Sequence, residues 1–227
     1  MSRRHSALHR AIARRYRHAA ALQRFRVSVV LSVVFFLFSV IVSFFAIGYA
    51  TQSASNSVAD IVLSNIPAFD IDGYFVWGTM LLVATIVIVL AVNPKRIPFT
   101  LNSLSVFYLI RSGFTVLTHL GPFPTQSDNT YNLGIIVGRF FTGNDFFFSA
   151  HTGMPFLLAL IFWRDKSLRI MFLCWSVFLG VIVLLGHLHY SIDVAAAFFI
   201  TYTIFCIVEW LFPRDRELFY MEADEEV

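Results

Sequence analysis

Six apolar runs constrain the fold of this chain more than any other feature. They cover residues 27–50, 74–92, 97–120, 146–163, 170–188 and 193–212. About 20 apolar residues are needed for an α-helix to cross the hydrocarbon core of a bilayer. With 58% hydrophobic and only 14% charged residues, the chain is too apolar for a soluble domain of its size. The sequence therefore predicts an all-α, polytopic membrane protein in which six transmembrane helices form one bundle.

Basic residues are distributed unevenly between the connectors of these runs. If all six runs cross the membrane, every Lys and Arg lies on the side of the two termini, except Arg139 and the intramembrane Arg111. Connectors rich in Lys and Arg stay in the cytoplasm. Both termini are therefore predicted to be cytoplasmic. The opposite connectors, which include residues 51–73 and 121–145, are predicted to lie outside.

The membrane domain, residues 27–212, is predicted to lie between a basic tail, 1–26, and an acidic tail, 213–227. The basic tail holds eight of the 17 Lys and Arg residues and no Asp or Glu. The net charge of +3 is therefore local, and a nucleic-acid partner is not indicated. Apolar residues at helical spacing allow a basic helix on anionic headgroups, but a disordered cytoplasmic tail is the preferred interpretation.

Polar residues interrupt the apolar pattern at residues 186–193, whose sequence is GHLHYSID. His189 and Asp193 are four residues apart and share one face of a helix. A carboxylate in that position fixes the tautomer of an imidazole and stabilises its cation. His187 faces another direction, so it is interpreted as an interfacial histidine with at most a supporting role.

A second polar cluster, residues 146–153 (FFFSAHTG), begins the fourth run. Ser149 and His151 can serve as ordinary hydrogen-bonding residues between helices. However, Pro155 cannot donate a hydrogen bond to the carbonyl of His151, so a kink with a pocket beside His151 is predicted. Since one pass in and one pass back separate His151 from His189, both histidines should lie at the outer face of the membrane.

Arg111 is the most costly residue in the membrane. Burying its guanidinium in the membrane costs on the order of 3 kcal/mol by insertion scales. The side chain is therefore expected to face the bundle interior and to pair with an anion. That anion is either a carboxylate, Asp145 or Asp193, or a phosphate bound by the planar fork of donors. A metal site at His151, His189 and Asp193 is an alternative, but the charge of Arg111 in the same layer would repel a cation.

Both histidine motifs resemble those of the lipid phosphatase/phosphotransferase superfamily, also called the type 2 phosphatidate phosphatase (PAP2) superfamily. Residues 148–152 (FSAHT) resemble its Ser-Gly-His signature, with Ala150 in place of glycine, and residues 189–193 match its His-x-x-x-Asp. The flanking residues, in 143–152 (GNDFFFSAHT) and 187–194 (HLHYSIDV), are similar to the sphingomyelin synthase branch. Arg111 before 120–124 (LGPFP) resembles that branch's Arg followed by a proline-containing turn.

The resemblance implies a phosphotransferase acting on lipids. His189, oriented by Asp193, would attack the phosphorus, and His151 would serve as acid and then as base. Arg111, with Ser149, would bind phosphate oxygens, while Asp145 and His187 are possible supporting residues. No cofactor or metal is implied, and the expected partners are a phospholipid donor and a hydroxyl lipid such as ceramide or diacylglycerol.

Two other functions are alternatives to this expectation. A lipid phosphatase or phospholipase C-like hydrolase of the same superfamily would use the same residues. An ion or proton-coupled transporter would use buried Arg, His and Asp as a relay, but transporters often contain internal repeats, and none is visible in this sequence. The reaction, in either enzyme, is predicted to occur at the extracytoplasmic side.

Overall fold

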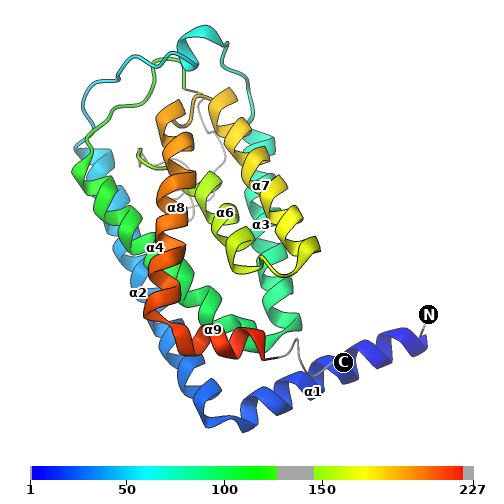
Figure 1. Cartoon of the computed structure of the whole chain (residues 1–227). Helices are drawn as coiled ribbons and strands as arrows, with labels where there is room; N and C mark the ends of the chain where they lie inside the picture. Colours follow the sequence, from blue (N-terminus) through cyan, green and yellow to red (C-terminus); the bar gives the residue numbers. More distant parts are fainter. Residues whose placement is uncertain (1, 127–145, 222–227) are drawn as a thin grey trace.

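The computed structural model describes residues 2–126 and 146–221. Every regular element in these ranges is a helix, and the helices form an elongated bundle (Figure 1). Four helices are long and apolar enough to cross a membrane: α2 (Gln23–Gln52), α3 (Asp72–Val92), α7 (Lys166–Leu185) and α8 (Ser191–Leu211). The predicted all-α class is confirmed, and four such helices support an integral membrane protein.

The remaining two predicted spans have different properties. α4 (Ile97–Leu117) has 21 residues but buries a polar set that includes Asn102 and Arg111. α6 (Ala150–Ile161) has only 12 residues, about 18 Å at 1.5 Å per residue. The prediction of one spanning helix over 146–163 is therefore wrong, because Ser149 ends the preceding segment and caps α6 by accepting the N–H of Thr152. Six crossings of the membrane stay a prediction.

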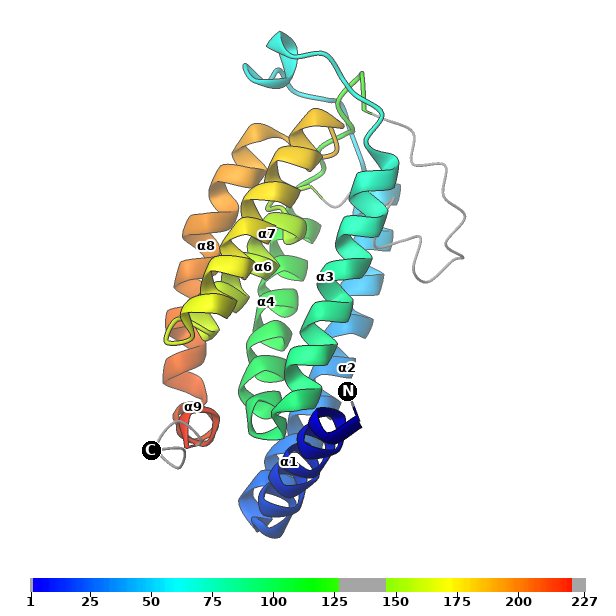
Figure 2. The ribbon, with the colours of Figure 1, turned by 90° about the vertical axis from the view of Figure 1, so that its right-hand side faces the viewer.

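α6 is surrounded by other helices. It packs against α7, α8 and α4, and it begins well below the ends of α7 and α8 that lie farthest from the termini (Figures 1 and 2). Gly153 permits this packing, because a Cβ there would lie 2.8 Å from Thr201 Oγ1 and 3.0 Å from the Phe107 ring. Side chains at the start of α6 are thus recessed inside the bundle.

The chain termini lie at one end of the bundle, here called the terminal end (Figure 2). It comprises α1 (Ser2–Ala21), α9 (Pro213–Tyr220), the short helix η2 (Pro94–Arg96) and the turn 162–165. Arg96 Nη1, in η2, lies 3.9 Å from Asp165 Oδ2, in the turn 162–165. The opposite end, here called the loop end, comprises residues 53–71, which include η1 (Leu63–Asn65), and residues 118–126 and 186–190. Basic segments are thus grouped as the charge pattern predicts, while the cytoplasmic orientation stays a prediction.

Residues 2–21 form a helix, so the interpretation of this segment as a disordered tail is wrong. The segment contains no Gly or Pro and is rich in Ala and Arg, which favour helix. α1 also has a tertiary contact, because Ala19 is buried against Phe25 and Leu218. Arg15 donates to the carbonyl of Val92 at 3.4 Å.

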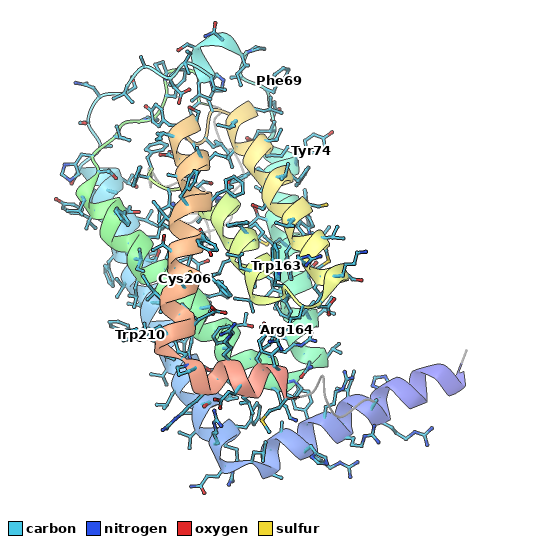
Figure 3. All side chains as sticks on the ribbon, viewed as in Figure 1. Phe69, Tyr74, Trp163, Arg164, Cys206 and Trp210 are labelled. Atoms are coloured by element: carbon cyan, nitrogen blue, oxygen red, sulfur yellow. The ribbon has the colours of Figure 1, made fainter. Side chains whose placement is uncertain are left out.

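Exposed aromatic side chains mark both ends of the bundle. Trp163 and Trp210 lie toward the terminal end, while Tyr74 lies toward the loop end (Figure 3). Trp210 is 79% exposed and Tyr74 67% exposed. Trp and Tyr are enriched where a membrane protein meets the two interfaces of the bilayer, so these positions support a membrane-embedded bundle surface between them.

Candidate active site

His189 and Asp193 form a buried pair at the start of α8. His189 Nδ1 lies 3.2 Å from Asp193 Oδ2, and the same oxygen accepts the backbone N–H of Tyr190 at 3.1 Å. With its proton on Nδ1, the imidazole donates to the carboxylate, which leaves Nε2 for chemistry. The two side chains meet as their spacing predicts, but His189 lies in the turn two residues before α8, so they do not share one face of a helix.

His151, in the first turn of α6, lies next to this pair. The ring centroids of His151 and His189 are 6.4 Å apart. The ring of Phe75, on α3, packs on His151 with a centroid distance of 4.5 Å. The starts of α6 and α8 are also joined directly, because the N–H of Ser149 donates to the carbonyl of Asp193 at 3.1 Å. The two predicted histidines therefore converge at one depth.

Arg111 is buried on α4, and its guanidinium reaches the segment that leads into α6. Nε donates to the carbonyl of Phe148 at 2.9 Å. Asp193, one of the two carboxylates expected to pair with it, bonds instead to His189 and Tyr190. Asp145, the other expected partner and a candidate supporting residue, lies outside the described residues.

Arg111 and His151 line the same cavity, which has a volume of about 340 Å³. Its other lining residues are almost all apolar and come from α2, α3, α4 and α6. From Arg111 to Leu101 the cavity follows α4 for ten residues, or about 15 Å. Val83 and Val87 line it and are 44% and 60% exposed, so the cavity extends to the outer surface of the bundle. The predicted pocket beside His151 is therefore present.

The hydroxyl group of Ser149 has a structural role in the described residues. Its Oγ accepts the N–H of Thr152 at 3.4 Å and the Thr152 hydroxyl at 3.3 Å. Ser176, on α7, donates to the carbonyl of Thr152 at 2.8 Å. Ser149 thus fixes the start of α6, where helix N–H groups without intrahelical partners favour an anion. Its predicted contact with phosphate stays a prediction.

His187 belongs to the loop end and contacts Thr125 and Phe123. Thr125 Oγ1 lies 2.6 Å from His187 Nδ1, and the Phe123 ring packs edge-on with a centroid distance of 5.3 Å. Burial lowers the pKa of His187, partly offset by the backbone of Ile66 and by Asp60. These contacts place His187 in the packing of the loop end, and its supporting role in the site stays a prediction.

Sequence reasoning missed two residues that hold the site from the loop end. Asp60 accepts the N–H and hydroxyl of Ser191. Tyr190 donates from its hydroxyl to the carbonyl of Gly121 at 2.9 Å and accepts the N–H of Val58 at 3.3 Å. The contacts that tie these residues to the site could not be predicted, because Ser191 and Gly121 lie far away from them in the sequence.

The arrangement combines a carboxylate-oriented imidazole, a second imidazole and a guanidinium beside an apolar cavity. An imidazole with a lone pair can attack phosphorus, and a protonated imidazole can protonate a leaving oxygen. A guanidinium stabilises the charge that spreads over phosphoryl oxygens. Within residues 2–126 and 146–221, no three His, Cys, Asp or Glu side chains are grouped to hold a metal ion.

Comparison with known proteins gives one finding. Residues 142–211 match the family model described as PAP2 superfamily C-terminal. This range contains α6, α7 and α8, and with them His151, His189 and Asp193. No curated protein and no solved structure matches the chain. The part of the chain that carries both histidines is therefore similar to the C-terminal part of the PAP2 superfamily.

Proposed function

We propose that this protein is an integral-membrane lipid phosphotransferase of the sphingomyelin synthase type. It transfers a phospho-headgroup, such as phosphocholine or phosphoethanolamine, from a phospholipid to a lipid hydroxyl, such as that of ceramide or diacylglycerol. The reaction takes place in the extracytoplasmic leaflet, and six helices cross the membrane. The observation that carries the proposal is the 6.4 Å separation of the His151 and His189 rings beside a cavity lined by Arg111.

The proposed first step forms a bond between His189 Nε2 and phosphorus and breaks the bond from phosphorus to the donor's glycerol oxygen. That oxygen takes a proton from His151, and diacylglycerol leaves. The attacking atom must come within about 3–3.5 Å of phosphorus, and the acid within about 2.6–3.2 Å of the leaving oxygen. The 6.4 Å between the centroids of the two imidazole rings is of the size needed for a phosphoryl group to contact both histidines.

The second step reverses these roles. His151, now neutral, takes the proton of the incoming hydroxyl, whose oxygen attacks phosphorus and displaces His189. Asp193 stabilises the His189 imidazolium during each transfer. Arg111 binds the phosphoryl oxygens as negative charge spreads over them. Water in place of the lipid hydroxyl gives hydrolysis.

The apolar cavity favours a lipid substrate over a soluble phosphate ester. Its two basic groups, Arg111 and His151, lie at one part of the lining, and apolar lining continues toward Leu90 and Leu101. Such a cavity can take an acyl chain while the headgroup phosphate meets the charged residues. Because Val83 and Val87 are exposed on its wall, a lipid can enter from the side of the bundle.

Headgroup-labelled phospholipids test the proposed reaction. The purified protein in lipid nanodiscs is given phosphatidylcholine or phosphatidylethanolamine labelled in the headgroup, with and without ceramide. We expect the label on a ceramide product when the acceptor is present and in a water-soluble phospho-headgroup when it is absent. Label that stays on the donor under every condition would contradict the proposal.

A lipid phosphatase is the second candidate, because the two histidine motifs also resemble those of the phosphatases of this superfamily. That enzyme would release inorganic phosphate from phosphatidate and would form no labelled ceramide product. A transporter is the third candidate. Ion flux into liposomes that persists in His189→Ala, without any phosphoryl transfer, would favour it.

Filling the cavity is expected to change acyl-chain selectivity. Leu101 lines its far end, so Leu101→Trp should reduce turnover of long-chain donors relative to short-chain donors by about tenfold, as expected for an apolar pocket that loses several methylene sites. Leu117→Trp is the matched control, because Leu117 lies on the same helix and is 79% exposed. Equal effects of the two variants on the chain-length ratio would contradict an acyl-binding cavity.

A further inference from the structure

The loop 53–71 places one carboxylate inside the loop end of the bundle. Asp60 is only 7% exposed. Its Oδ1 accepts the backbone N–H groups of Val62 at 2.8 Å and Leu63 at 3.0 Å. Its Oδ2 accepts the backbone N–H and the hydroxyl of Ser191 at 2.7 and 2.8 Å. Asp60 therefore joins this loop to the start of α8.

Ser191 lies midway between the two members of the buried pair, two residues after His189 and two before Asp193. As the first residue of α8, it has an N–H without an intrahelical partner, and a carboxylate is favoured there by the helix dipole. Asp193 accepts the N–H of Tyr190, and Asp60 accepts the next N–H along the chain. Two carboxylates from different parts of the sequence thus fix the backbone of this turn.

Asp60 acts on this turn as an ionised acceptor. Burial alone would raise its pKa, but hydrogen bonds from the backbone of Leu63, Ser191 and Val62 and from the Ser191 hydroxyl hold the pKa below its usual value. An ionised carboxylate accepts through both oxygens, whereas an asparagine side chain replaces one oxygen by a donor NH₂. In Asp60→Asn, that NH₂ would face an N–H group on one side or the other.

We propose that Asp60 is a positioning residue for the nucleophilic histidine and that it acts through Ser191. By fixing the turn 189–193, it holds His189 Nε2 in line with the phosphorus that this nitrogen attacks. The inference rests on the proposed phosphotransferase function, because it requires His189 to be the attacking group. Misplacement of a reacting group by about 1 Å can cost on the order of 100-fold in rate.

Asp70 offers a matched control in the same loop. Its Oδ1 accepts the backbone N–H of Asp72 at 3.3 Å, and Asp72 is the first residue of α3. Both aspartates therefore accept the N–H of the first residue of a membrane helix, but the turn before α3 contains no histidine. A purely structural effect of losing a helix cap should appear in both Asp60→Asn and Asp70→Asn.

The test compares purified full-length Asp60→Asn, Ser191→Ala, Asp70→Asn and His189→Ala with the unmodified protein. Thermal unfolding gives the folded fraction, and kcat and KM for the labelled donor are expressed per folded molecule. We expect Asp60→Asn to lower kcat by about 10- to 100-fold with KM changed by less than about threefold. Ser191→Ala, which keeps the backbone hydrogen bond, should lower kcat by about 3- to 10-fold. Asp70→Asn should stay within about twofold of the unmodified protein.

The outcomes separate the two proposals. Full kcat in folded Asp60→Asn, with His189→Ala inactive, would overturn the positioning role and leave the proposed function standing. Turnover by His189→Ala would overturn the proposed function itself. If Asp60→Asn does not fold, the kcat of Ser191→Ala tests the positioning role in its place. An unchanged kcat in that variant would also overturn the positioning role.

Discussion

His189→Ala is expected to abolish turnover of every phospholipid donor and to prevent transfer of the headgroup label to the protein. Loss of a covalent nucleophile removes the intermediate itself, so the expected decrease in kcat is on the order of 10⁴-fold or more. The effect should not depend on the leaving group of the donor, because the bond to phosphorus can no longer form. Samples of protein with labelled donor, quenched in alkali because a bond between phosphorus and a histidine nitrogen is labile in acid, measure the intermediate directly.

His119→Ala is the control for a histidine near the same end of the bundle. His119 is exposed, and its ring packs against Tyr49 with a centroid distance of 5.7 Å. We expect kcat within about twofold of the unmodified protein, as for a surface substitution. Headgroup label that remains attached to His189→Ala protein would show that another residue is the nucleophile.

The membrane helices could be predicted from the sequence because their signal is local. A run of about 20 apolar residues needs no knowledge of distant contacts, and the predicted runs 27–50 and 74–92 lie within α2 and α3. The short α6 could not be predicted in the same way. Its start depends on a cap by Ser149 and its burial on contacts with α7, α8 and α4.

The histidine pair could also be predicted, for two different reasons. His189 and Asp193 are only four positions apart, so their contact is local, although His189 lies in the turn before α8. The approach of His151 to His189 required a topology in which α6 and α7 run in opposite directions. That topology follows if successive apolar runs cross the membrane in alternating directions. The 6.4 Å between the two ring centroids agrees with it.

Asp60 and the role of Ser149 could not be read from the sequence. Asp60 lies in a polar loop without a motif, and its partner Ser191 is 131 positions away. Ser149 has the residue type of a phosphate ligand, yet its Oγ accepts hydrogen bonds from Thr152. Residue type and spacing indicate which groups come near a site, while the hydrogen bonds that orient them depend on the folded loops.

His151→Ala is expected to produce a defect that depends on the leaving group. With natural phospholipid, the departing alkoxide needs a proton from His151, so kcat should fall by about 10²- to 10⁴-fold. A donor with a nitrophenolate leaving group needs no proton, because that anion is stable at neutral pH. For such a donor the first step in His151→Ala should stay within about tenfold of the unmodified protein, since only acid catalysis has been removed.

The second step of this variant gives the more specific result. His151 must also take the proton of the incoming hydroxyl, so His151→Ala given the activated donor should accumulate the headgroup on His189. A rapid burst of nitrophenolate, followed by slow turnover and a labelled protein, is the expected observation. The double variant His151→Ala/His189→Ala should show neither burst nor label. If natural and activated donors lose the same factor in His151→Ala and no label accumulates, His151 acts in substrate binding or packing against Phe75, and the acid-base assignment is wrong.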